Sequence, residues 1–243
     1  MIKPTLVSLS LLLVLVAIFG LNPFATYIDA KETLEPGYTD FETGAKRLAN
    51  GTYQISALTR MPGVEPEMVR WWMTEYMQTS EHYQLWHPQD HVWMDWENKQ
   101  PGSIVGASHL VHEYIGGEMS KLRIQFVDPS EFFGYDPNSE TTFVICAHPG
   151  LLEEQIYLGK MCHVVRETPW GAEMRSRFWL GYVAARDGNN AHQTLLTLIA
   201  NTAIARMFTL DQAAAVGLQT HAIEEMGFLA DLLPDLYEQH RSD

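Results

Sequence analysis

The sequence has few cysteines and few basic residues, and each shortage argues against a class of protein. Only two cysteines, Cys146 and Cys162, occur in 243 residues, and their spacing matches neither a zinc ribbon nor a C-x-x-C motif. Any metal site must therefore use histidine and carboxylate ligands. The 16 lysines and arginines stand against 30 acidic residues, which gives a formal charge of −14. Because no basic cluster occurs, the charge argues against nucleic acid and anionic membrane surfaces as partners.

Charge is also missing from the N-terminus, where no charged residue occurs between Lys3 and Asp29. The apolar run in this segment, from Leu6 to Leu21, is typical of a signal peptide or a membrane anchor. We therefore expect residues 1–30 to direct export, either by removal or as a single anchor with N-terminal membrane association. The rest of the chain would then work outside the cytoplasm, in a periplasmic or extracellular location. A buried N-terminal helix is the disfavoured alternative, because no polar residue marks a second face.

The remaining chain is expected to form one catalytic-size domain of residues 64–243, preceded by a turn-rich wrapping segment of residues 31–63 with a short strand near residues 53–58. Apolar residues at helical spacing predict a helix over residues 65–79. Alternation then predicts a half-buried strand over residues 121–128, and further strands over residues 141–148, 160–167 and 172–184. Both cysteines fall in these apolar strands, which favours buried free thiols over a disulfide.

A long helix near the C-terminus carries ionisable groups on its apolar face. We expect the motif TLDQ, residues 209–212, to act as its capping box. Residues three and four apart share a face of a helix, so His221 and Glu225 lie on one otherwise apolar stripe, made of Leu218, Ala222, Leu229 and Leu232. A lone buried carboxylate is costly unless it is paired or binds a metal. The pair is thus a candidate metal site, with a surface salt bridge or a satisfied core histidine as the competing interpretation.

Further imidazoles and carboxylates occur in the predicted sheet. In the strand GASHLVHEYIGG, alternation places Glu113 on one face with His109, while His112 points the other way. The loop LWHPQDHVW adds His87 and His91. Two histidines and two glutamates, namely His91, Glu113, His221 and Glu225, suit a divalent metal with an open coordination position. Strands followed by a long amphipathic helix predict an α+β fold, in which a curved antiparallel sheet grips the C-terminal helix.

Several of these segments together resemble the 2,4-diacetylphloroglucinol hydrolase family, which includes phloretin hydrolases. The motifs are YQLWHPQDH, SHLVHEYIGG, RIQFVDPSEFF, HVVRETPWGAEMRSRFWLG and HAIEE, in this order within residues 64–235. The resemblance implies a helix-grip fold of the birch-pollen-allergen and START type, with Zn²⁺ in an internal cavity. It also implies hydrolysis of the carbon–carbon bond between an acyl group and a phenolic, phloroglucinol-type ring.

Position by position, the resemblance places the zinc ligands at His91, Glu113, His221 and Glu225, and its W-x-P-x-x-H motif selects His91 over His87. Tyr83 and Tyr182 match its substrate-contacting tyrosines. His163 shares a strand face with apolar neighbours and is a third candidate catalytic group in the cavity. The expected partner is a small phenolic aryl ketone, and a homodimer is one option for the oligomeric state.

Two other functions remain open at this stage. A non-catalytic carrier of apolar ligands would use the same cavity without a metal, and a zinc esterase or amidase would direct the same activated water at another bond. An export segment is not expected in a cytoplasmic catabolic enzyme. It therefore leaves the identity of the substrate less determined than the type of reaction.

Overall fold

The computed structural model describes residues 30–241, so the predicted signal peptide or anchor lies almost entirely outside the described residues. Within this range nine strands form one antiparallel sheet in the order β1-β2-β8-β7-β6-β5-β4-β3, and β9 pairs with β8. The strands are β1 (Gly44–Arg47), β2 (Tyr53–Pro62), β3 (His91–Glu97), β4 (Ser108–Ile115), β5 (Glu118–Val127), β6 (Thr142–Leu151), β7 (Ile156–Thr168), β8 (Gly171–Asp187) and β9 (Asn190–His192).

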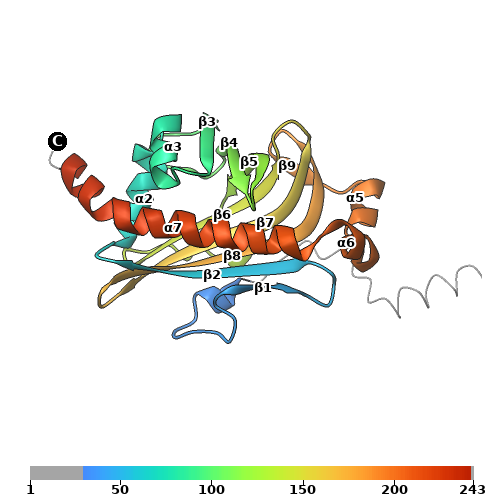
Figure 1. Ribbon diagram of the computed structural model, residues 1–243, viewed down its shortest axis with the longest axis horizontal. Helices are drawn as coiled ribbons and strands as arrows, with labels where there is room; N and C mark the ends of the chain where they lie inside the picture. Colours follow the sequence, from blue (N-terminus) through green and yellow to red (C-terminus); the bar gives the residue numbers. More distant parts are fainter. Residues whose placement is uncertain (1–29, 242–243) are drawn as a thin grey trace, which may run out of the picture.

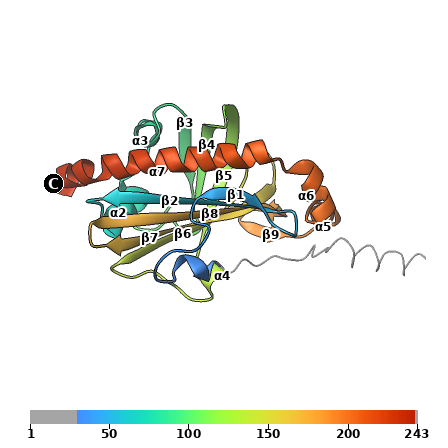
Figure 2. The same cartoon turned by 60° about the horizontal axis from the view of Figure 1, so that its bottom comes forward.

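The long helix α7 (Gln212–Arg241) runs across the curved sheet (Figure 1). The shorter helical segments are η1 (Lys31–Thr33), α2 (Pro66–Trp71), η2 (Trp72–Tyr76), α3 (Ser80–Trp86), α4 (Ser130–Phe133), α5 (Leu195–Ala200) and α6 (Ala203–Thr209). Figure 2 shows α7 on one side of the sheet, with α4 on the other. The helix-grip prediction is therefore confirmed. No helix among residues 30–241 is long and apolar enough to cross a membrane.

The helix α7 buries the face that the sequence predicts, although its start differs. Its buried residues recur at helical spacing and are Ala215, His221, Ala222, Met226, Leu229, Ala230 and Leu233. The predicted capping box at Thr209 is wrong, because the Thr209 hydroxyl donates to the Ala205 carbonyl within α6. Instead the Asp211 carboxylate accepts from the Ala214 amide at 2.8 Å, and this bond caps the first turn of α7.

Glycine allows α7 to cross the turn between β4 and β5 at very short range. A Cβ atom added at Gly217 would lie 2.9 Å from the Gly116 Cα atom. Gly116 itself has a φ of +61°, in the left-handed region that favours glycine. This contact brings the first turns of α7 against the end of β4, the strand that carries Glu113.

The N-terminal segment is more closely tied to the sheet than the sequence predicts. Its strands β1 and β2 are part of the sheet, and β2 pairs with β8 along its whole length. The outward arginines of β8, Arg175 and Arg177, are fully buried because Glu42 covers them. The Glu42 carboxylate lies 2.5 Å from the Arg175 Nη2 atom and 2.7 Å from the Arg177 Nη2 atom. Much of β8 is therefore covered on both faces.

The predicted helix over residues 65–79 is also interrupted. The α-helix α2 continues as the π-helical turn η2, and the chain becomes extended at Met77. The reason is local, since Thr79 must leave the helical conformation for its side chain to cap α3 through the His82 amide. This break starts a separate helix, α3, which carries Tyr83.

The two cysteines form a disulfide, which corrects the prediction of free thiols. Cys146 of β6 and Cys162 of β7 are direct partners in the antiparallel register, with 4.1 Å between their Cα atoms. Both side chains are buried in the smaller apolar cluster beside Trp179. Their separation of 16 residues does not reveal this pairing, because it depends on the length of the turn that joins the strands.

Candidate metal centre and cavity

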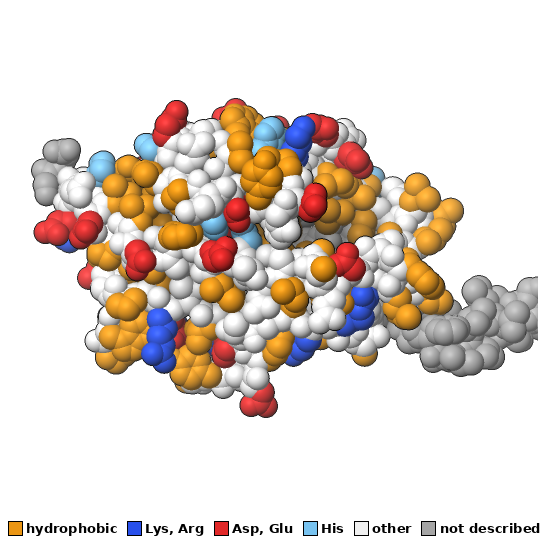
Figure 3. Space-filling model, viewed as in Figure 1, with side chains coloured by type: hydrophobic (Ala, Val, Ile, Leu, Met, Phe, Trp, Pro, Cys, Tyr) orange, Lys and Arg blue, Asp and Glu red, His pale blue; other side chains and the backbone are white. Residues whose placement is uncertain are grey.

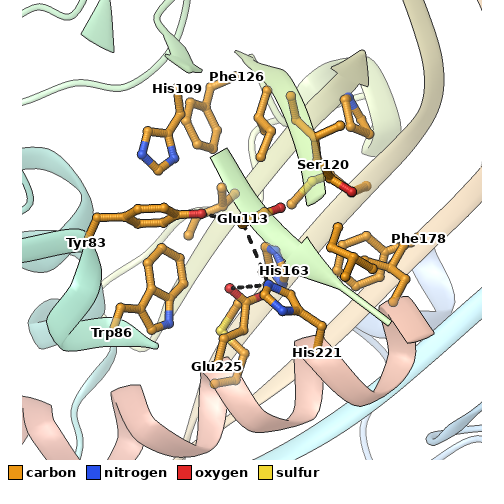
Figure 4. A pocket seen from close by; sticks show the side chains of 18 of the residues that line it. Tyr83, Trp86, His109, Glu113, Ser120, Phe126, His163, Phe178, His221 and Glu225 are labelled. Atoms are coloured by element: carbon orange, nitrogen blue, oxygen red, sulfur yellow. Dashed lines mark hydrogen bonds and ion pairs between the residues drawn. The ribbon is translucent and has the colours of Figure 1, made fainter. Parts of the chain in front are cut away.

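Four side chains from three elements converge inside the sheet, as Figure 4 shows for three of them. His91 begins β3 and is the direct partner of Glu113 on β4, while His221 and Glu225 lie one turn apart on α7. The His91 Nε2 atom lies 3.7 Å from the Glu113 Oε2 atom and 3.6 Å from that of Glu225. The His221 Nε2 atom lies 3.7 and 3.9 Å from the same two oxygens. Each imidazole therefore faces both carboxylates.

This arrangement fits a divalent metal. Nitrogen and oxygen ligands bound about 2.0–2.2 Å from a tetrahedral zinc lie roughly 3.3–3.6 Å from one another, close to the distances seen here. His91, Glu113 and His221 form a group whose ligand atoms all lie within 4.8 Å of one another. The Nε2 atom of His91 is buried and has no hydrogen-bond partner among the described residues. A buried nitrogen without a partner is costly unless a further group satisfies it, and a metal would do so.

Neighbouring groups orient the two imidazoles. The Nδ1 atom of His91 lies 2.9 Å from the Tyr83 carbonyl oxygen, and the Nδ1 atom of His221 lies 3.2 Å from the Asp90 carboxylate. Such contacts hold a proton on Nδ1 and direct the Nε2 lone pair at a metal. The Tyr83 ring stacks on His91 at 3.7 Å, and its hydroxyl donates to Glu113. The chain thus supplies both the candidate ligands and contacts that orient them.

The electrostatics of the site favour a positive charge between the carboxylates of Glu113 and Glu225. Burial raises the pKa of Glu113, and the nearby Glu225 carboxylate raises it further. Burial also acts to raise the pKa of Glu225, but contacts with His91 and His221 lower it overall. For His221, the two glutamates outweigh burial and raise its pKa. Two buried carboxylates thus require protonated imidazoles or a metal cation between them.

A cavity of about 320 Å³ opens beside these residues, between the sheet and α7. Glu113, His221 and Glu225 form part of its wall, and most of the rest is apolar, including Met161, Met174, Phe178, Leu218 and Leu229. An apolar cavity with a few polar groups is typical of a site for a small organic ligand. Apolar walls also exclude water from the carboxylates and strengthen their interaction with a cation.

Two of the three predicted catalytic residues line this cavity. Tyr83 enters from α3, and His163 from β7, as Figure 4 shows. The His163 Nδ1 atom lies 2.7 Å from the Ser176 hydroxyl, and burial lowers the pKa of His163 to about 4. His163 is therefore a neutral imidazole near neutral pH, able to exchange a hydrogen bond with a ligand.

Tyr182 does not reach the cavity, which corrects its predicted inward direction. Gly181 adopts a φ of +97°, and the register with β7 shifts at this point. This irregularity breaks the alternation, so Leu180 lines the cavity whereas Tyr182 lines a separate pocket. The Tyr182 hydroxyl accepts from the Asn50 side chain at 3.4 Å. The Tyr182 side chain therefore lies away from the candidate metal centre and contacts the rest of the fold.

Sequence reasoning missed the roles of Asp90 and His109. Asp90 lies one residue before His91, yet its contact with His221 depends on the fold. His109 lines the cavity, stacks on Trp96 at 4.7 Å, and its buried Nε2 atom has no partner among the described residues. Its shared strand face with Glu113 was the available signal. His87 packs on the outer side of His221, 5.2 Å between ring centres, and not between the two glutamates.

Comparison with known proteins places this arrangement in a family. Residues 24–238 match the DAPG hydrolase PhiG domain. The chain is 28% identical over 210 residues to phloretin hydrolase of Eubacterium ramulus, which covers 79% of this chain and 70% of the relative. It is 24% identical over 236 residues to 2,4-diacetylphloroglucinol hydrolase of a Pseudomonas species, covering 87% and 76% of the two chains.

Solved structures resemble the chain at low sequence identity. The crystal structure of Ara h 8.0201 is 9% identical, with a TM-score of 0.45, and covers 75% of this chain and 97% of its own. Protein Ms6760 from Mycobacterium smegmatis is 11% identical, with a TM-score of 0.40, and covers 82% and 98%. The family match, in contrast, extends over most of the sequence and includes every residue of the candidate metal centre. The chain belongs to the DAPG hydrolase PhiG domain family.

Proposed function

We propose that this protein is a zinc-dependent hydrolase that cleaves the carbon–carbon bond between an acyl group and a hydroxylated aromatic ring. The observation that carries the proposal is the convergence of His91, Glu113, His221 and Glu225 beside an apolar cavity, whose wall includes Glu113, His221 and Glu225. Family membership supports the reaction class, because the relatives are named as hydrolases of phloretin and 2,4-diacetylphloroglucinol. The expected substrate is a small phenolic ketone.

The four ligands would hold Zn²⁺ and leave room for a further ligand. Zinc bound in such a site lowers the pKa of a water molecule and polarises a carbonyl oxygen. The role of the chain is to hold the aryl ketone so that its carbonyl faces this position. The apolar wall binds the ring, and the depth of the cavity keeps bulk water away from it.

The cleavage also needs a proton on the ring carbon that leaves the acyl group. We assign proton donation to Tyr83, since its hydroxyl lies at the cavity wall beside Glu113, and burial raises its pKa so that the phenol holds its proton at neutral pH. His163 and His109 are neutral imidazoles at the cavity wall, because burial lowers their pKa values to about 4 and about 3. We assign them to hydrogen bonds with ring hydroxyl groups, which would select a polyhydroxylated ring.

Export is part of the proposal. The uncharged run between Lys3 and Asp29 suits a signal peptide or an anchor. The Cys146–Cys162 disulfide supports the same location, since disulfides persist in oxidising compartments such as the periplasm. Fractionation of cells that express the full chain tests this point, and reduced full-length protein in the cytosol would contradict it.

Metal analysis combined with turnover tests the proposed chemistry. We expect close to one zinc per chain in purified protein, and its loss in the double variant His221→Ala, Glu225→Ala that remains folded by circular dichroism. An acylphloroglucinol should release its carboxylic acid in a chelator-sensitive reaction, followed by mass spectrometry. The matched analogue without the ortho hydroxyl should react far more slowly, because it cannot form the keto tautomer whose carbon leaves.

Other outcomes would contradict the proposal in different ways. Zinc that persists in the double variant would refute the ligand assignment. Equal rates on both ketones would refute ring protonation. Turnover of aryl esters or amides alone would favour a zinc esterase or amidase. Tight binding of phenolics without metal would favour a non-catalytic carrier.

A further inference from the structure

The helices α5 and α6 expose an unusual number of large apolar side chains. Leu195 and Leu196 of α5 are 75% and 78% exposed, and Met207 and Phe208 of α6 are 63% and 85% exposed. Ile199 of α5 is 54% exposed. Figure 3 shows orange side chains gathered at the right-hand end of the molecule, where Figure 1 places both helices. We call these five residues the α5–α6 patch.

The polar groups of the same helices point inward. Arg206 is the only charged residue from position 193 to 210, and it is 1% exposed. Its guanidinium donates to the Gly181 carbonyl at 2.8 Å and to the Asn201 side chain at 3.1 Å. Asn201 is buried in turn and donates to the Val183 carbonyl at 2.7 Å. The helices are therefore held firmly to β8 with their charge buried and their apolar side chains outward.

This arrangement inverts the usual surface of a soluble protein. Single exposed apolar residues are ordinary, but a contiguous apolar patch without exposed charge marks a contact site. The charge that a water-facing helix would show is not missing from the protein, which carries 46 charged residues as 16 basic and 30 acidic side chains. No charged side chain is exposed between residues 193 and 210, so an apolar occupant that forms no ion pairs fits this surface.

The N-terminal sequence favours a lipid bilayer as the occupant. Twenty-nine residues precede the described chain, and between Lys3 and Asp29 they carry no charge. A chain brought to a bilayer by such a segment gains by burying a second apolar surface there. The formal charge of −14 argues against an anionic surface, which leaves a zwitterionic one.

We propose that the α5–α6 patch lies in the interface of a zwitterionic bilayer and seats the domain there. Its five side chains would enter the boundary between head groups and acyl chains, while buried Arg206 keeps the helices fixed to β8. The patch directly precedes α7, whose residues Ala214 and Leu218 line the cavity. Seating requires no catalytic activity, so its test is independent of the proposed reaction.

Site-specific fluorescence in phosphatidylcholine vesicles tests this proposal with the full chain. Single variants Leu196→Cys and Phe208→Cys are labelled with a nitrobenzoxadiazole dye, because Cys146 and Cys162 are bonded and buried. The matched control is Leu85→Cys on α3, which is 45% exposed and lies away from the patch. We expect a blue shift, a several-fold rise in emission and strong quenching by nitroxide-labelled phosphatidylcholine at residues 196 and 208, with no change at residue 85.

Each other result would overturn the proposal. A blue shift without quenching by the nitroxide lipid would mean that protein covers the patch, either a second copy or the N-terminal segment. Emission typical of water at residues 196 and 208 would mean that the patch stays in solvent. Equal quenching at all three sites would mean that the vesicle contacts the domain without using this surface.

Discussion

Replacing Asp90 by asparagine isolates the contribution of the contact that orients His221. The substitution would keep the shape of the side chain but remove the negative charge that lies 3.2 Å from the His221 Nδ1 atom. Loss of such an outer contact lowers metal affinity by about 10- to 100-fold, or roughly 1.4–2.7 kcal/mol. The Asp90 side chain is 28% exposed and its contact is long for a hydrogen bond, so we expect a loss close to tenfold.

The zinc affinity is measured by competition with a fluorescent chelator at pH 7. Glu224→Gln provides the control, because Glu224 is 52% exposed and contacts His87 and not the candidate ligands. We expect the control to bind zinc like the unmodified protein. An Asp90→Asn variant with unchanged affinity would refute the orienting role. A loss as complete as that of the ligand variants would instead make Asp90 a direct ligand.

Three further predictions concern stability and substrate binding. Burial alone would raise the pKa of Glu42, but hydrogen bonds from two arginines lower it to about 2. Its contribution to stability is therefore complete above pH 4.5 and is lost as the pH falls towards 2. Glu42→Gln should flatten this part of an acid-unfolding curve, and an unchanged curve would contradict the pairing. In a urea titration, Gly217→Ala should lower the free energy of unfolding by about 1–3 kcal/mol, because its Cβ atom would meet Gly116. The control Gly227→Ala should be neutral or stabilising, since a Cβ atom there would have nothing within 4 Å. His109→Phe should raise KM for hydroxylated aryl ketones several-fold with zinc content and fold unchanged, and an unchanged KM would exclude contact with the substrate.

Periodicity was sufficient to find three of the four candidate ligands, for a physical reason. Helical spacing fixes the directions of His221 and Glu225, and strand alternation fixes the direction of Glu113. Regular elements therefore reveal which side chains point the same way. The family resemblance then selected His91, which begins its strand and has little periodic context of its own.

The errors occurred where tertiary structure overrides local pattern. Tyr182 follows Gly181, which breaks the alternation of β8; a glycine inside a strand is the signal of such a break, and strict alternation ignored it. The disulfide depends on the register between β6 and β7, which the length of a turn determines. The burial of the β8 arginines was not predicted, because their partner, Glu42, lies more than 130 positions earlier. The hydrophobic periodicity of a segment does not reveal which distant segment it will pair with.

The groups of the candidate metal centre lie far apart in the sequence, so the centre forms late in folding. His221 meets Asp90 across 131 positions, and Glu225 lies beyond it on the last helix. During synthesis the sheet can form first, but the centre cannot close until α7 has emerged and docked. An ion bound there would tie the edge of the sheet to the end of the chain, much as a disulfide closes a long loop. Metal capture would thus mark the completion of folding as well as the start of activity.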